Sequence, residues 1–177
     1  FYSVKWRNLE FPPPNTQTSQ WLLVAESEEW SDELAEEMTK LGQSTTQVSL
    51  SKASQKTAFW DTYLNESIDG IIWNTGLFAG DLTDSDPYTR LHCESVVSLL
   101  TALKRNEIET LPRGLQFLTT HAVNASESDT VNPDSAQWWG FGKVVGNEYP
   151  YLRSRIIDLL ESSNCKHLCE VLLSEAR

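Results

Sequence analysis

Short apolar segments alternate with amphipathic segments along most of this chain. Residues 21–25 (WLLVA) are apolar throughout, as in a strand that is covered on both faces of its sheet. A helix capped by Ser31 is expected next, because apolar residues follow at the helical spacing of positions 34, 38 and 41. The predicted strands cover residues 21–25, 46–50, 68–73, 115–120 and 156–159, and the predicted helices cover residues 31–41, 54–65, 88–106, 138–149 and 163–175. This alternation predicts an α/β fold: a Rossmann-like, mostly parallel sheet with helices on both faces.

The N-terminal residues stand outside that alternation. Residues 2–7 alternate between apolar and polar side chains, as in a half-buried strand. Three prolines at positions 12–14 and a polar stretch to residue 19 predict an extended linker. We therefore expect a strand and Pro-rich linker over residues 1–19 and a Rossmann-like subdomain over residues 20–177. The first strand is expected to pair with a strand outside this sheet.

Composition and charge exclude several classes of partner. The chain has 177 residues and a net charge of −11, from 14 Lys and Arg against 25 Asp and Glu. Nucleic acids and anionic lipid surfaces attract basic proteins, so neither nucleic acid nor membrane is an expected partner. No apolar run approaches the roughly 18 residues of a membrane span. Three cysteines form no complete disulfide set, which indicates a reducing compartment and a cytoplasmic location.

Three glycines lie in the helix predicted from Trp138. Inside a helix each costs roughly 1 kcal/mol relative to alanine, so close approach to another element is the usual reason to keep it. We expect Gly142 and Gly146 to let this helix lie against the sheet or a partner. The predicted buried stripe of the helix is Trp138, Phe141, Val145 and Tyr149.

The loops that follow the predicted strands lack the features of a nucleotide site. A dinucleotide-binding fold places Gly-x-Gly-x-x-Gly after its first strand, so that backbone N–H groups reach the pyrophosphate. Residues 26–30 (ESEEW) contain no glycine, and their three carboxylates would repel a pyrophosphate. The GLFAG loop at residues 76–80 is interpreted as a tight turn. Asp81, Asp84 and Asp86 after it do not have the spacing of a calcium loop and are interpreted as solvated.

The catalytic pair of short-chain reductases is also missing. That chemistry needs a Tyr and, four residues later on the same helix face, a Lys that lowers the pKa of the phenol. Tyr149 and Tyr151 are followed at this distance by Arg153 and Arg155, and Pro150 breaks the helix between them.

The histidines and cysteines form no complete site. On a helix Cys165 and Cys169 share one face while His167 points away, so we expect two buried thiols and no zinc site. His92 has no base or orienting partner visible in the sequence, and His121 ends a strand without other support. The sequence therefore predicts no catalytic, cofactor-binding or metal-ligating residue.

The run at residues 138–159 (WWGFGKVVGNEYPYLRSRIIDL) resembles the structural subdomain of ketoreductases in modular polyketide synthases. That family usually shows Trp-Gly-Leu-Gly-Arg-Val, then Glu-His-Pro-Glu-Leu, then a strand that ends in Asp-Leu. Residues 2–6, 21–24 and 70–73 match strands of the family in the same order, so the resemblance covers nearly the whole chain. One departure is Tyr149, which stands where the family usually has His.

The resemblance implies a truncated Rossmann-like fold without an NADPH site of its own. Such a subdomain supports a second, catalytic subdomain, which binds NADPH and holds the catalytic Tyr, Ser and Lys. The implied partners are that catalytic subdomain or an adjacent synthase domain, such as a C-methyltransferase or an enoylreductase. A structural half can also persist as a pseudo-ketoreductase. The chain alone is thus expected to be a non-catalytic scaffold of a polyketide synthase.

A second hypothesis belongs to a different class. The same Rossmann-like frame could be a free-standing enzyme with an unusual ligand loop that binds a nucleotide or S-adenosylmethionine. Direct titration with those ligands separates the two hypotheses.

Overall fold

The computed structural model describes residues 12–26, 28–50, 57–64, 67–75, 85–124, 130–159 and 164–175. The described strands are β1 (Gln20–Ala25), β2 (Ser44–Ser49), β3 (Gly70–Asn74), β4 (Gly114–Thr120) and β5 (Arg155–Leu159). The described helices are α1 (Glu28–Lys40), α2 (Thr57–Asp61), α3 (Ser85–Arg105), α4 (Pro133–Glu148) and α5 (Cys165–Glu175), with a 3₁₀ turn, η1 (Pro150–Leu152). The predicted strands and helices are thereby confirmed, with shifted ends. The strand expected at residues 2–7 lies outside the described residues.

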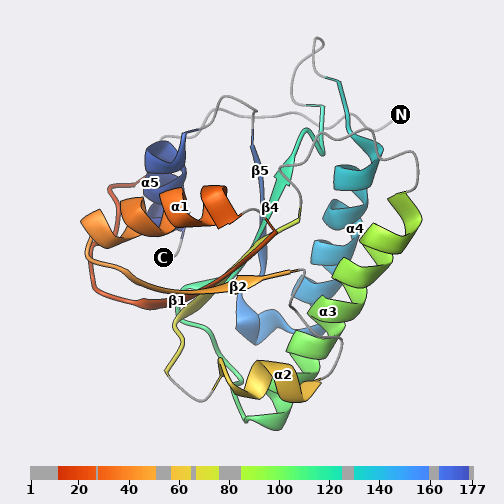
Figure 1. Ribbon diagram of the computed structural model, residues 1–177, viewed down its shortest axis with the longest axis horizontal. Coiled ribbons are helices and arrows are strands. Elements are labelled where there is room, and N and C mark those ends of the chain that lie inside the picture. Colours follow the sequence, from red (N-terminus) through yellow and green to blue (C-terminus); the bar gives the residue numbers. More distant parts are fainter. Residues whose placement is uncertain are drawn as a thin grey trace.

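The five strands form one parallel sheet in the order β2-β1-β3-β4-β5 (Figure 1). From β1 the chain moves outward to β2, then returns to the other side of β1 and continues through β3 and β4 to β5. The direction of winding therefore reverses between β1 and β3. The predicted α/β, Rossmann-like class is confirmed.

Helices cover both faces of the sheet. On one face, α1 and α5 bury a core that includes Leu34, Met38 and Leu172. On the other face, α2, α3 and α4 bury an aromatic core, in which the Trp60 and Trp73 ring centroids lie 5.8 Å apart. Strand β3 is buried along its whole length, as expected for a strand covered on both faces. No helix among the described residues has both the length and the apolar character needed to cross a membrane.

Helix α1 begins three residues before the predicted cap. Ser31 lies inside the helix and is 6% exposed, so the prediction that it caps the helix is wrong. Glutamates occupy the first two positions instead, and Glu residues suit the positive end of the helix dipole. Extending the helix upstream also places Trp30 against the core formed with α5.

The residues after the prolines are fixed to the sheet by a buried arginine. Arg113, just before β4, is 5% exposed. Its Nε donates to the Ser19 hydroxyl at 2.8 Å, and its Nη2 donates to the Gln17 carbonyl at 2.8 Å. The Gln43 amide donates to the same carbonyl at 3.2 Å. The end of the predicted linker is thus held at the amino edge of the sheet, where the strands begin.

Helix α4 starts earlier than predicted because Asn132 and Pro133 give it a strong N-terminus. The Asn132 side chain accepts from the backbone N–H of Asp134 at 3.0 Å, and Pro133 occupies the first turn, where its missing N–H costs nothing. At the other end the chain turns through η1 and reaches β5 after Arg153, whose φ of 50° is left-handed. The helix therefore spans the full height of the sheet.

Only one glycine of α4 is explained by close packing. A Cβ on Gly142 would lie 2.7 Å from Cγ1 of Ile156 on β5, so the predicted close approach is confirmed there. At Gly146 the nearest atom would be the Ser154 Cβ at 4.0 Å, and at Gly140 nothing lies within 4 Å. The expectation that Gly146 brings the helix against the sheet is therefore wrong, whereas its alternative, close approach to a partner, stays a prediction.

The predicted stripe of α4 holds for its first three members. Trp138 and Val145 are buried and Phe141 packs against the same core, where the Trp138 and Phe117 rings lie 6.0 Å apart. Tyr149 is 37% exposed, because the helix ends at Glu148 and the next residue no longer follows the helical spacing.

The packing at Gly142 gives the first prediction. Gly142→Leu should lower the free energy of unfolding by about 1–3 kcal/mol, because the side chain would overlap Ile156. Gly140→Ala in the same helix is the matched control and should stabilise by up to about 1 kcal/mol. Urea unfolding followed by circular dichroism measures both. Equal stability of the Gly142→Leu variant and the unchanged protein would contradict the close-packing explanation.

Candidate functional site

The carboxyl edge of the sheet is where doubly wound folds bind ligands, at the point where the winding reverses. In this chain that point lies between the ends of β1 and β3. After β1 only residues 26 and 27 precede α1, so the turn has no room for a glycine-rich loop. The Glu26 carboxyl at this turn has a pKa raised by burial. After β3, Thr75 is bonded back to β4: its N–H and its hydroxyl both donate to the Leu118 carbonyl, at 3.0 and 2.7 Å.

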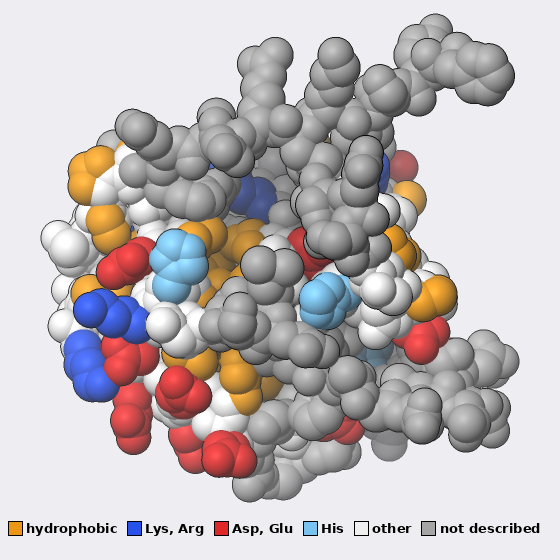
Figure 2. Space-filling model, turned by 90° about the horizontal axis from the view of Figure 1, so that it is seen from above, with side chains coloured by type: hydrophobic (Ala, Val, Ile, Leu, Met, Phe, Trp, Pro, Cys, Tyr) orange, Lys and Arg blue, Asp and Glu red, His pale blue; other side chains and the backbone are white. Residues whose placement is uncertain are grey.

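Figure 2 views the molecule from the top of Figure 1, and on the described part of that face the acidic side chains gather mainly on one side. The loop at residues 76–80 lies outside the described residues, as do Asp81 and Asp84. Asp86 belongs to α3 and not to a loop. The described residues that flank the reversal point, Glu26 and Thr75, include neither a glycine nor a cation that could face the phosphates of a dinucleotide.

Asp158 and His121, at the ends of β5 and β4, have structural partners. The Asp158 carboxylate accepts from the Thr119 hydroxyl at 2.7 Å and from the backbone N–H groups of Ala122, at 2.9 Å, and Val123, at 3.1 Å. His121, which has a left-handed φ of 53°, accepts from the Asn132 N–H at 2.7 Å through its carbonyl. The Asp-Leu end of the last strand therefore holds the chain that leaves β4.

The histidine and the thiols that the sequence singled out lie in the core. Burial lowers the pKa of His92 to about 4, and its ring packs edge-on against Trp138 with centroids 6.0 Å apart. Burial, together with nearby carboxylates, raises the pKa of Cys165 to about 12. Burial is also the largest cause that raises the pKa of Cys169 to about 12. Thiols of this kind are protonated at neutral pH and are poor nucleophiles. The two expected buried thiols are confirmed, and His167 is exposed.

No group of three or more potential metal-ligating side chains occurs within the described part of the chain. The three cysteines are not disulfide-bonded. The residues that the sequence suggested for chemistry are thus dispersed: His92 on α3, packed against Trp138 of α4, His121 in the turn after β4, and the two thiols on α5.

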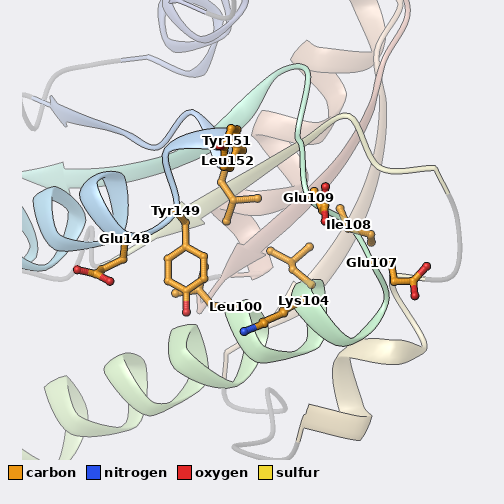
Figure 3. A pocket seen from close by; sticks show the side chains of 10 residues that line it. Leu100, Lys104, Glu107, Ile108, Glu109, Glu148, Tyr149, Tyr151 and Leu152 are labelled. Carbon is orange, nitrogen blue, oxygen red and sulfur yellow. The ribbon is translucent and has the colours of Figure 1, made fainter.

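A hollow of about 610 Å³ lies at the opposite, amino edge of the sheet (Figure 3). Its floor is apolar, with Leu100 and Leu103 from α3, and Leu152 from η1. Tyr149 and Tyr151 border it from the turn after α4. Sequence patterns do not predict this hollow, because Tyr149 falls in the predicted buried stripe of α4. The pair of tyrosines around Pro150 is the sequence signal that points to it.

Charged side chains surround the hollow. Lys104 at the end of α3 is the basic group, and the acidic groups are Glu107, Glu109 and Glu148. Glu107 and Glu148 lie at opposite ends of the hollow in Figure 3. The hollow is therefore apolar in its floor and acidic in its rim.

Solved structures with this arrangement of strands and helices include ketoreductases. The chain matches a C2-type ketoreductase from a modular polyketide synthase with a TM-score of 0.71 and 19% identity, over 97% of this chain and 37% of that one. This chain has the fold of one part of a polyketide synthase ketoreductase. A multidomain structure of a keto acid-selecting NRPS module, with adenylation, ketoreductase and pseudo-Asub domains, gives a TM-score of 0.75 and 17% identity, over 96% of this chain and 16% of that one.

Sequence similarity points to the same class of protein. The chain is 29% identical over 157 residues to a phenolphthiocerol/phthiocerol polyketide synthase of Mycobacterium tuberculosis. The match covers 85% of this chain and 9% of that synthase polypeptide, so the chain spans a small part of the relative. No protein-family model matches the chain. The resemblance predicted from residues 138–159 is therefore confirmed. The solved structures match in fold to ketoreductases, and the sequence relative is a polyketide synthase.

The buried histidine gives a prediction on pH. The pKa of His92 is lower in the folded state (about 4) than in the unfolded state (6.5), so the unfolded state takes up the proton first as pH falls. The stability that neutral His92 gives is present above pH 6.5 and is lost between pH 6.5 and 4, by about 3 kcal/mol. His92→Gln should remove this part of the pH dependence, which urea unfolding at pH 7, 5.5 and 4 measures.

Exposed His167 supplies the control. His167→Gln should keep the pH dependence of the unchanged protein. If His92→Gln and the unchanged protein lose the same stability between pH 7 and 4, His92 is not held neutral by burial.

Proposed function

We propose that this chain is the structural, non-catalytic subdomain of a polyketide synthase ketoreductase. The observation that carries the proposal is the match between nearly the whole chain and one part of a ketoreductase: 97% of this chain against 37% of that structure. A subdomain that only supports a neighbour should have a complete hydrophobic core and no ligand-binding or catalytic site of its own. The two cores on either side of the sheet meet the first condition.

The turn after β1 supports the second condition. A dinucleotide needs glycines there, so that the backbone can approach the pyrophosphate. The short passage from Glu26 into α1, followed by Glu29, offers negative charge instead. We infer that residues 20–177 form the subdomain, bind no NADPH and hold no catalytic or metal-ligating residue. NADPH would belong to a partner catalytic subdomain.

The role that follows is support and docking. The chain would stabilise the NADPH-dependent catalytic subdomain, or dock an adjacent synthase domain such as a C-methyltransferase or an enoylreductase. In a pseudo-ketoreductase it would keep this role without an active partner. The three free thiols agree with a cytoplasmic location, where thiols stay reduced.

Calorimetric titration with NADPH and, separately, with S-adenosylmethionine tests the proposal. We expect no heat of binding at ligand concentrations up to about 1 mM, which corresponds to less than about 4 kcal/mol of affinity. A positive control is a complete ketoreductase titrated with NADPH under the same conditions. Binding of either ligand in the micromolar range would overturn the non-catalytic role and favour a free-standing Rossmann-like enzyme.

A further inference from the structure

The exposed apolar side chains gather on one side of the molecule. Among the described residues five large hydrophobic side chains are exposed, and four of them belong to α3, α4 and the turn after α4. They are Val97 (53% exposed), Val144 (57%), Tyr149 (37%) and Tyr151 (71%). Helices α3 and α4 share one core and lie on the same face of the sheet (Figure 1). Two of the four, Tyr149 and Tyr151, lie together at the hollow, and apolar groups that lie together mark an interaction surface.

The hollow at the amino edge continues this surface. Its floor of leucines can receive an apolar side chain, and Tyr151 stands beside it as the most exposed of the four. Exposed tyrosines of this kind are the usual anchors of protein interfaces, because they bury much area for few rotatable bonds.

The turn that carries the tyrosines is fixed before any partner arrives. Pro150 starts the 3₁₀ turn, and the Arg153 guanidinium donates to the Pro112 carbonyl at 3.0 Å. The Tyr149 N–H donates to the Val145 carbonyl at 2.8 Å. A surface that is already ordered loses less conformational entropy on binding.

The rim of the hollow selects the charge of the partner. Three carboxylates and one ammonium group line the hollow, which lies at the C-terminal ends of both α3 and α4, where the helix dipoles are negative. Glu148 lies in the last turn of α4, and that turn holds no basic residue to compensate it. A positively charged segment is therefore attracted, whereas an acidic one is repelled.

We propose that the hollow and the adjoining α3–α4 surface dock a basic segment of a neighbouring synthase domain. An apolar side chain of the segment fills the hollow between Tyr149 and Tyr151, and flanking Lys or Arg residues pair with Glu107, Glu109 and Glu148. The proposal rests on the proposed function in one respect: the partner is taken to be a domain of the same synthase.

Two synthetic peptides test the surface: Ac-KLKWKLK-NH2 and its acidic counterpart Ac-ELEWELE-NH2. Titration into the ¹⁵N-labelled chain, followed by amide chemical shifts, should show saturable binding of the basic peptide alone. The shifts should be confined to the last turn of α3, residues 106–109 and residues 148–152. Saturable binding of the acidic peptide at this site, or shifts spread over the acidic surface, would overturn the proposal, as would the absence of binding by the basic peptide.

Matched variants separate the site from the general negative charge. Replacing both Glu107 and Glu109 by Gln should weaken binding of the basic peptide about fivefold. The same double change at exposed Glu29 and Glu36 on α1, on the other face of the sheet, removes equal charge and should leave the affinity unchanged. Equal weakening by the two pairs would mean that only net charge attracts the peptide and would contradict a specific site.

The tyrosine anchor has its own control. Tyr151→Ala should weaken binding about tenfold, while Val131→Ala, at the exposed hydrophobic side chain away from this surface, should have no effect. Failure of these peptide tests would remove the docking surface and leave the non-catalytic role standing. Binding of NADPH would overturn the non-catalytic role and leave the docking surface standing, so each proposal can fail without the other.

Discussion

Burial of the parallel sheet on both faces is the constraint on which the rest of this structure depends. Parallel sheets are usually covered by helices on both faces, and their central strands are then buried on both sides. The whole of β3 and all but the first residue of β1 are buried, and two separate cores form above and below them. The helices are therefore fixed in place by packing, and a partner or ligand can reach the chain at the two ends of the strands and on the outer surfaces of the helices.

Polar groups hold the fold at both ends of the strands. At the amino edge Arg113 fixes the residues before β1. At the carboxyl edge Thr75 is bonded to β4, and Asp158 holds the chain between β4 and α4. At the amino edge the tyrosines and carboxylates around the hollow face solvent. The turn after β1 is acidic and has no glycine, which is one of the observations behind the proposed supporting role.

Helix α4 connects the core to the proposed docking surface. Its aromatic side, with Trp138 stacked on Phe117, is packed into the core, and Gly142 brings it against Ile156 of β5. The helix ends at Glu148, just before Pro150, and the turn that follows places Tyr149 and Tyr151 beside the hollow. The same stretch that resembles a ketoreductase thus positions, in this chain, the residues with which we expect a partner to make contact.

The sequence by itself determined the alternation of strands and helices, the two-sided burial of β1 and β3, the missing glycine loop and the close packing at Gly142, because each depends on local periodicity or on residue type. Only the tertiary structure decided the rest. Ser31 is buried because α1 packs its first turn against the sheet, and Tyr149 is exposed because α4 ends one residue earlier. The hollow could not be predicted, since residues about 45 positions apart form it; their approach depends on how α3 and α4 cross the sheet. Local patterns report which face of an element is apolar, whereas the exposure of a side chain depends on the neighbours that the whole fold brings to it.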